Sequence, residues 1–578
     1  MTRVERELSR LNTSYNPTLS TNEDSNSEET KVDETHLVMA VVLNSDPGDP
    51  KQYRDIVGRD DEFQWRSSIE KELNSMAERK VFGDRIQEIP KGTRALGTRW
   101  IFKTKSDGRK KARLVAQGYT QIPGVDYSES FAPVVANSTV HVILVITLYM
   151  VKNSDSDWVC DVIDVETAFL NADLSETVII RTPEGMQSDY PYVMLNKALY
   201  GLAQSPLAWY KTMKGILLDA RIDGIVICPS GIDPCLFIAK KNGNLVGLIA
   251  LYVDDCIFAG HVDFVKQLKK YVSSRFNIKD LGPIKKYLGV NYSLKGDAGD
   301  DPYFEASLKE YVDDIVKDYE KEFDCVVKSR NSPTITSAVI SNEEETVVLQ
   351  SKYRSYVGRL LFAVSKCMPE IASNVRELSE KLEEPTMRDW KKVEGVIGYL
   401  KQYKPLKITC PKKLEPHVFV DSDYATDKKD RKSVTGFIAT IGGSVVNWKS
   451  KKQSGITLSS TEAEFVALST ASTEVVYLNN LLKEIFEKQF SGVVYEDNQG
   501  AIFLANNQQL GQRTKHIDVR YKYTNECIEK GELRIVYVKS EDNVADLVSK
   551  GTATKVFAKL SDIVLNGQIQ PLLNCESN

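Results

Sequence analysis

The sequence lacks the features that define several protein classes. None of its nine cysteines forms a C-x₂-C pair, which excludes a zinc finger and a thioredoxin-type site. A chain of 578 residues does not need disulfides for stability, and scattered thiols fit a reducing compartment. The N-terminus has no apolar signal core, and the longest apolar run, residues 140–151, is too short to span a bilayer and predicts a buried helix. We therefore expect a soluble, intracellular protein without a membrane partner.

The chain also lacks an excess of charge of one sign. Its 75 basic and 80 acidic side chains give a net charge of −5, so any contact with nucleic acid requires a local basic patch. Hydrophobic residues at 42% and charged residues at 27% exclude wholly disordered, collagen-like and coiled-coil proteins. At roughly 150 residues per domain, the length indicates about four folding units.

Composition and periodicity divide the chain. The polar, aromatic-poor first 50 residues predict a flexible leader or inter-domain linker. Helical spacing of apolar residues over 64–79 predicts an amphipathic helix. After residue 414, strand-like and helix-like segments alternate in the order βββαβαβ, which predicts a mixed sheet with flanking helices.

Two adjacent carboxylates, Asp254 and Asp255, lie between apolar, β-prone runs within residues 249–260. This pattern predicts a hairpin whose turn carries the acids out of an apolar sheet. Two anions there are unfavourable unless a cation neutralises them, and oxygen ligands favour Mg²⁺ or Mn²⁺. The alternative is a solvated Asp-Asp turn, which the apolar flanks disfavour.

A third carboxylate, Asp164, follows an apolar strand and precedes the pair Ala168 and Phe169. Taken alone, Asp164 could equally cap the start of a helix. Together with Asp254 and Asp255 it would complete a two-metal site, which activates an attacking hydroxyl and stabilises a leaving phosphate oxygen.

The segment 91–113 contains nine basic side chains and a single acid, Asp107. A solvated run of charge is one interpretation. The interleaved Trp100 and Phe102, with a turn at Asp107 and Gly108, favour a two-stranded finger whose basic face would hold a triphosphate and a template backbone.

Four more acids lie at strand ends or on a helix in the C-terminal part of the chain. They are Asp421, Glu464, Asp497 and Asp546. Acids in such places can converge at one sheet edge and bind two metal ions, although each alone could be a cap or a surface charge.

Nine sequence segments occur in an order that resembles a known family. They are TRWIFKTKSDGRKKARLVAQGYTQ, VDYSESFAPV, DVETAFLNADL, ALYGLAQSPLAWY, YVDD, DLGPIKKYLGV, DSDYATDKKDRKSVTGF, LSSTEAEFVAL and RTKHID. From about residue 53 to about residue 550, the chain is similar to the pol region of copia-type long-terminal-repeat retrotransposons. The aspartic protease motif and the integrase zinc pattern are not found, so we expect either the mature polymerase–ribonuclease H part of the polyprotein or a pol sequence truncated at its 5′ end.

The resemblance implies an α/β and α+β multidomain protein: a right-hand polymerase with fingers, palm and thumb, a connection, and a ribonuclease H-like mixed sheet with flanking helices. The expected parts are a leader (1–50), fingers and palm (51–300), thumb and connection (301–410), ribonuclease H (411–552) and a C-terminal tail (553–578). Glu370 replaces an Asp of the family's connection, which is not catalytic, so we expect little loss from this difference.

The resemblance also implies roles for individual residues. The palm acids Asp164, Asp254 and Asp255 would be catalytic metal ligands, and the D, E, D, D order of the C-terminal acids would serve ribonuclease H in the same way. The residues expected to bind nucleotide or template are Lys103, Lys111, Arg113, Phe169, Tyr200, Gly201, Gln204 and Tyr252. The Phe169 ring would clash with a 2′-hydroxyl and so favour deoxynucleotides, with core packing as the alternative. His516 would contact the substrate or help product release, with a structural histidine as the alternative.

The expected activity is RNA-directed DNA polymerisation, with degradation of the copied RNA strand by ribonuclease H. Each active site would use two Mg²⁺ ions, for which Mn²⁺ would substitute. The expected partners are an RNA template, a DNA primer or RNA–DNA hybrid, deoxynucleoside triphosphates and a priming tRNA, with the integrase and capsid protein of the same element as further candidates. The expected place is the cytoplasm, in virus-like particles, with nuclear entry of the complex as a further candidate. The alternative function is a catalytically decayed or co-opted nucleic-acid-binding remnant.

Overall fold

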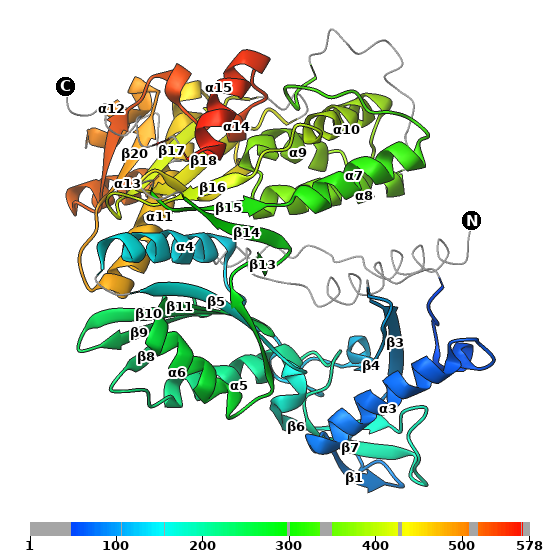
Figure 1. Ribbon diagram of the computed structural model, residues 1–578. Helices are drawn as coiled ribbons and strands as arrows, with labels where there is room; N and C mark the ends of the chain where they lie inside the picture. Colours follow the sequence, from blue (N-terminus) through cyan, green and yellow to red (C-terminus); the bar gives the residue numbers. More distant parts are fainter. Residues whose placement is uncertain are drawn as a thin grey trace.

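The computed structural model describes residues 48–105, 107–154, 157–296, 301–335, 350–425, 430–507, 518–567 and 569. Within these residues the chain forms four sheets of four to six strands and a separate two-stranded hairpin. Figure 1 shows these sheets with helices packed on them. Residues 1–47 of the expected leader, and His516, lie outside the described residues.

The N-terminal region combines a helix, a hairpin and a small sheet. Helix α3 (Glu62–Glu78) agrees with the predicted amphipathic helix, and it packs against the hairpin of β3 (Thr98–Thr104) and β4 (Lys110–Ala116). The side chains that α3 buries are those of Trp65, Ile69 and Met76. The strands of the sheet are, in spatial order, β1 (Phe82–Ile86), β7 (Tyr192–Lys197), β6 (Asp173–Arg181) and β2 (Ala95–Leu96).

The central sheet has six strands, and all its neighbouring strands are antiparallel. In spatial order they are β12 (Ile278–Pro283), β5 (Trp158–Val165), β11 (Asp255–His261), β10 (Asn244–Tyr252), β9 (Leu236–Lys241) and β8 (Val226–Pro229). Figure 1 shows α5 (Ser205–Asp219) and α6 (Val262–Ser273) below this sheet and α4 (Asn137–Asn153) above it. The apolar run at 140–151 thus forms the buried helix that its composition predicts.

A second four-stranded sheet connects the central sheet to a group of helices. Its strands are β13 (Lys286–Tyr287), β14 (Val290–Lys295), β15 (Tyr303–Ser307) and β16 (Leu406–Thr409). The helices are α7 (Lys309–Glu322), α8 (Gln350–Lys366), α9 (Ala372–Ser379) and α10 (Met387–Leu400). Because β16 pairs with β15, the end of this helical segment returns to the sheet from which it began.

The C-terminal region is the mixed sheet that the sequence predicts. In spatial order its strands are β19 (Ser444–Lys452), β18 (Val434–Ile441), β17 (Pro416–Asp423), β20 (Gly492–Glu496) and β21 (Leu533–Tyr537). The first three are antiparallel, whereas β17, β20 and β21 run parallel. The long helix α11 (Ser460–Phe486) packs on this sheet, and α13 (Asp518–Glu529) packs against α11.

The predicted order βββαβαβ was wrong at one point. An additional helix, α12 (Gln499–Asn506), follows β20. It has eight residues and buries only Ala501 and Ala505, so its apolar pattern is too short to stand out in the sequence. The interval expected to be a tail contains α15 (Thr554–Leu565), which buries one apolar face. The predicted fold class, a mixed α/β and α+β multidomain chain, is confirmed.

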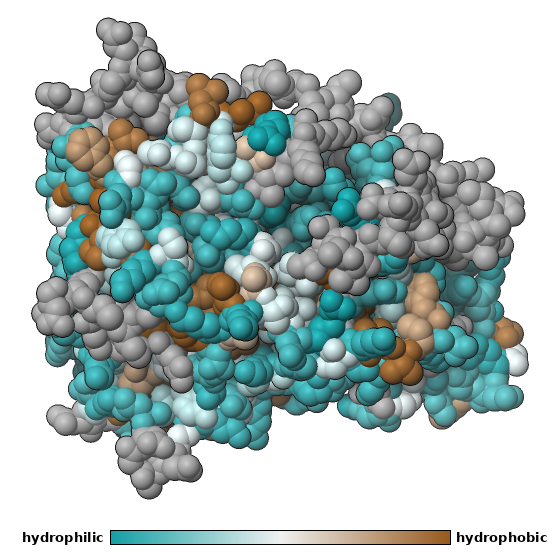
Figure 2. Space-filling view, turned by 90° about the horizontal axis from the view of Figure 1, so that it is seen from above, coloured by the Kyte–Doolittle hydropathy of each residue, from teal (hydrophilic) through white to brown (hydrophobic). Residues whose placement is uncertain are grey.

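Two hydrophobic cores organise the described residues. The smaller core belongs to the N-terminal region, and the larger one continues from Val135 to Ile569 through the central sheet, the helices and the C-terminal sheet. None of the described helices has the length and apolar content needed to cross a bilayer. The face shown in Figure 2 is mostly hydrophilic, with small, separated hydrophobic patches.

Candidate active sites

The first candidate site lies at the turn between β10 and β11. Asp254 is in the turn itself, and Asp255 begins β11 directly opposite Asp164 on β5. The Val165 N–H donates a hydrogen bond of 2.9 Å to the Asp254 carbonyl, which ties the turn to β5. The hairpin therefore brings all three acids to one end of the central sheet.

The turn has an unfavourable backbone conformation. Val253 has φ +54°, which a β-branched residue rarely adopts. The Trp209 indole donates a hydrogen bond to the Val253 carbonyl from helix α5, and the apolar strands on both sides are buried. Packing thus holds the acids in a turn that the local sequence alone would not favour.

The carboxyl groups at this turn share an electrostatically unfavourable position. Burial, with the nearby charge of Asp164, raises the pKa of Asp254 above 3.8. Burial and then the charges of Asp254 and Asp164 raise the pKa of Asp255 to about 6. The positive charges of Lys111 and Arg113 oppose the shift at Asp254. A bound cation would relieve the same repulsion.

Basic side chains of the β3–β4 hairpin and two aromatic rings from other segments lie near these acids. The Arg113 guanidinium lies 4.9 Å from the centre of the Tyr200 ring, and Tyr200 contacts Phe169 edge-to-face at 5.2 Å. Lys103 and Lys111 are cross-strand neighbours on β3 and β4. Burial, then the neighbouring Arg113, lowers the pKa of Lys111.

Phe169 and Tyr252, two other predicted site residues, are packed within the protein. Phe169 is only 5% exposed and packs in the larger core, which agrees with its core-packing interpretation. Tyr252 ends β10 opposite Asp255, and burial raises the pKa of its hydroxyl above 10.

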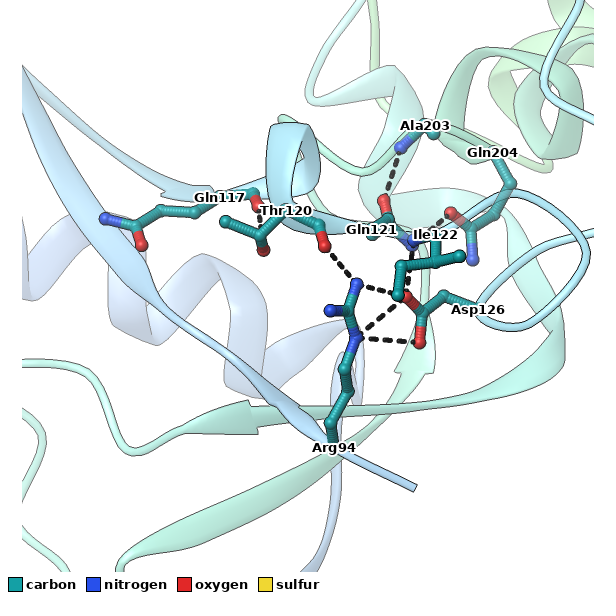
Figure 3. A network of polar contacts seen from close by, with 8 residues as sticks. All are labelled: Arg94, Gln117, Thr120, Gln121, Ile122, Asp126, Ala203 and Gln204. Carbon is teal, nitrogen blue, oxygen red and sulfur yellow. Dashed lines mark hydrogen bonds and ion pairs between the residues drawn. The ribbon is translucent and has the colours of Figure 1, made fainter. Parts of the chain in front are cut away.

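The turn at Gly201 requires glycine. Its φ is +87°, and a Cβ atom there would lie 2.3 Å from the Ala116 carbonyl oxygen. This close approach brings the segment that leads into α5 against the end of β4. Gln204 follows in that segment, where its side-chain oxygen accepts a hydrogen bond from Gln121 (Figure 3).

The second candidate site lies at one edge of the C-terminal sheet. Asp421 on β17, Glu464 on α11 and Asp497 after β20 each offer a carboxylate oxygen, and these oxygens lie within 4.8 Å of one another. In the part of the chain that the structure describes, no other group of three acid, histidine or cysteine ligands is this close. Asp164, Asp254 and Asp255 are therefore less tightly gathered than this carboxylate trio.

The carboxylate trio fits a divalent cation. Burial and then the charges of Glu496, Asp421 and Asp497 raise the pKa of Glu464 to about 10. Oε2 of Glu464 and Oε2 of the fully buried Glu496 have no hydrogen-bond partner among the described residues. Such a crowded set of acids needs protons or a cation, and an all-oxygen donor set suits a hard divalent ion.

Asp546 lies beside the trio and is paired with a lysine. Lys550 Nζ is 2.8 Å from Asp546 Oδ1 and 3.3 Å from Asp421 Oδ2. Burial and then the charge of Asp421 raise the pKa of Asp546 to about 6, although Lys550 opposes this shift. The ammonium group of Lys550 thus lies between two of the predicted metal ligands.

Sequence reasoning missed three residues at these sites. They are Glu496, Lys550 and Gln121. Lys550 had a local signal, since it follows Asp546 by four residues on a short helix. Glu496 adjoins Asp497, but the inward direction of its side chain depends on the strand pleat.

Comparison with known proteins agrees with this arrangement. Residues 82–330 match the family model described as reverse transcriptase (RNA-dependent DNA polymerase). The chain is 31% identical over 539 residues to the retrovirus-related Pol polyprotein from transposon TNT 1-94 of Nicotiana tabacum, covering 90% of this chain and 39% of that protein. It is 31% identical over 511 residues to the corresponding polyprotein from transposon RE2 of Arabidopsis thaliana, covering 86% of this chain and 34% of that protein. This chain therefore spans well under half the length of these relatives.

A solved structure of the foamy viral protease-reverse transcriptase in complex with double-stranded DNA is also similar. The TM-score is 0.43 at 13% sequence identity, over 82% of this chain and 70% of that one. The family match defines the class of residues 82–330, which is the reverse transcriptase family. Over 86% to 90% of its length, the chain is similar to copia-type retrotransposon Pol proteins.

Proposed function

We propose that this chain is the RNA-directed DNA polymerase of a copia-type retrotransposon, and that its C-terminal domain degrades the RNA strand of the hybrid. The observation that carries the proposal is the presence of two separate carboxylate sites in one chain. One is the hairpin of Asp254 and Asp255 facing Asp164, and the other is the carboxylate trio. The family match of residues 82–330 supports the polymerase assignment.

In the polymerase site, Asp164 and Asp254 would hold two Mg²⁺ ions, or Mn²⁺ in their place, and Asp255 would support the site less directly. When bound, such ions activate an attacking hydroxyl and stabilise a leaving phosphate oxygen. Lys111 and Arg113 approach the same acids and would attract the triphosphate. Lys103, Tyr200, Gly201 and Tyr252 would complete the surface for nucleotide and template, and Phe169 would select deoxynucleotides.

In the ribonuclease H site, the carboxylate trio and Asp546 would hold the divalent ions. The raised pKa of Glu464 supports this role, because bound cations would replace the proton that burial otherwise imposes. His516 would contact the substrate or assist product release.

The proposed parts are fingers and palm at 51–300, thumb and connection at 301–410, and ribonuclease H at 411–552. The substrates would be an RNA template, a DNA primer and deoxynucleoside triphosphates, with a priming tRNA. Integrase and capsid protein of the same element are the proposed partners, in cytoplasmic virus-like particles.

Primer extension and RNA cleavage by the same protein test the proposal. Asp254→Asn should abolish extension on an RNA template and leave cleavage of an RNA–DNA hybrid intact, because the two sites share no ligand. Glu464→Gln should do the reverse. The exposed Asp60→Asn and Glu384→Gln are matched controls that should retain both activities.

Loss of both activities from either single change would contradict the two-site assignment. Absence of extension by the wild type, when it is folded and still binds hybrid, would favour a decayed or co-opted nucleic-acid-binding protein.

A further inference from the structure

A buried pair of amides lies at the start of α5, the helix whose Trp209 donates a hydrogen bond to the Val253 carbonyl in the turn of the proposed polymerase site. Gln121 Nε2 donates a hydrogen bond of 3.0 Å to Gln204 Oε1, and Gln121 Oε1 accepts one of 2.8 Å from the Ala203 N–H (Figure 3). Gln121 and Gln204 are 8% and 3% exposed. One side chain therefore contacts two consecutive residues at the start of α5.

The direction of both amides is determined by hydrogen-bond chemistry. A backbone N–H can only donate, so the Gln121 oxygen must face Ala203 and its NH₂ group must face Gln204. Gln204 must then present its oxygen to Gln121. Its own NH₂ group is left as a buried donor without a hydrogen-bond partner in the part of the chain that the structure describes.

The segment that carries Gln121 is itself firmly held. Arg94 Nε–H donates to both carboxylate oxygens of Asp126, at 2.9 and 3.2 Å, and Arg94 Nη2 donates to Asp126 and to the Thr120 carbonyl. Asp126 Oδ2 also accepts a hydrogen bond of 2.6 Å from the Ile122 N–H. Figure 3 shows these bonds closing the loop on both sides of Gln121.

Backbone packing fixes this loop against the turn that precedes α5. A Cβ atom at Gly118 would lie 1.9 Å from the Gly201 carbonyl oxygen, so the two backbones are in direct contact. The Tyr200 carbonyl also accepts a hydrogen bond of 2.8 Å from the Ala116 N–H. Gln121 is thus held at a constant position relative to Gln204.

We infer that Gln121 is a positioning residue of the polymerase site, which orients the Gln204 amide so that its NH₂ group is available to an oxygen of the incoming nucleotide. This inference rests on the proposed function. Gln204 would touch the substrate, and Gln121 would act only through it. Arg94 and Asp126 hold the loop in place for this purpose.

The near-isosteric change Gln121→Glu is the sharpest test. A carboxylate still accepts from Ala203 but cannot donate, so Gln204 must turn its NH₂ group inward to satisfy it. The donor is then withdrawn from the nucleotide. We expect the KM for deoxynucleotide to rise about tenfold, as for the loss of one hydrogen bond, with kcat changed less. Template–primer affinity and RNA cleavage should stay near the wild type, whereas burial of the new carboxylate should lower the melting temperature.

Gln117→Glu is the matched control, because it makes the same change in the same segment and Figure 3 shows its side chain away from Gln204. In a Gln204→Ala background, Gln121→Glu should add no further rise in KM. Arg94→Lys, which keeps the charge but loses the planar fork, should raise KM in the same direction by less.

The outcomes separate this inference from the proposed function. A KM for Gln121→Glu equal to that of the wild type would overturn the positioning role alone. Additive effects of Gln121→Glu and Gln204→Ala would also overturn it, since the two residues would then act independently. If the wild type neither extends a primer nor binds deoxynucleotide on template–primer, the proposed function fails and the inference fails with it.

Discussion

Glu370 is buried where the helices meet the C-terminal region, and its burial predicts how the stability of the protein changes with pH. It lies in the short 3₁₀ helix Pro369–Ile371, which packs against α8, α15 and the short helix α14 (Asp546–Ser549). Its side chain is 1% exposed, and neither carboxylate oxygen has a hydrogen-bond partner in another residue that the structure describes. Burial raises the pKa of Glu370 from 4.5 to about 8.

The direction in which pH changes the stability follows from the protonation of Glu370 in the folded and in the unfolded chain. In the folded chain Glu370 stays neutral up to about pH 8, whereas in the unfolded chain it ionises above pH 4.5. Unfolding therefore releases a proton in this window, and the free energy of unfolding falls by about 1.4 kcal/mol per pH unit. By pH 7 the burial of Glu370 costs about 3 kcal/mol, and the loss ends near the folded pKa.

The change Glu370→Gln removes the ionisable group while nearly keeping its shape. Urea unfolding should be measured at pH 5, 6, 7 and 8 for the wild type, Glu370→Gln and the exposed control Glu384→Gln. The buried amide of Glu370→Gln adds a constant cost, so the informative quantity is the difference from the wild type as a function of pH. Between pH 5 and pH 7 this difference should shift by about 3 kcal/mol in favour of Glu370→Gln. A difference that stays flat across this range would refute the reasoning.

Two further changes test the sites themselves. Lys550→Met removes the ammonium group between Asp421 and Asp546, so Mn²⁺ should bind more tightly by isothermal titration calorimetry, while the metal-free protein should melt at a lower temperature; unchanged Mn²⁺ affinity would contradict this. Gly201→Ala should destabilise the protein by at least about 2 kcal/mol in urea unfolding, because its Cβ would lie 2.3 Å from the Ala116 carbonyl oxygen in a left-handed backbone conformation, and stability like that of the wild type would count against it.

Local sequence patterns were sufficient where the signal lies within one element or one hairpin. The apolar runs around Asp254 predicted the β10–β11 hairpin, because both strands are buried on a continuous apolar sheet. The turn at Asp107 and Gly108, flanked by Trp100 and Phe102, predicted the β3–β4 hairpin for the same reason. These elements carry their structural information in a few adjacent residues.

Contacts between distant segments could not be predicted from local sequence patterns. Gln121 and Gln204 are separated by 83 positions, and no spacing rule connects them. Their pairing depends on the backbone approach of Gly118 to Gly201, which appears only when β4 and α5 are placed together. The sequence pattern selects Asp497 and not its neighbour Glu496, and only the fold shows that Glu496 is completely buried. Sites formed by such tertiary contacts require the coordinates.

Helix α4 shows how the two candidate sites are held relative to each other. The palm strand β5 contacts one side of α4 and the C-terminal strand β19 contacts another, so the helix is buried between two sheets. His141 on α4 lies 3.3 Å from the Val446 carbonyl and stacks on Trp448, and burial lowers the pKa of His141 to about 4, so it packs as a neutral ring at pH 7. Because a close-packed core resists deformation, this continuous packing, rather than a linker, sets the distance between the palm acids and the carboxylate trio.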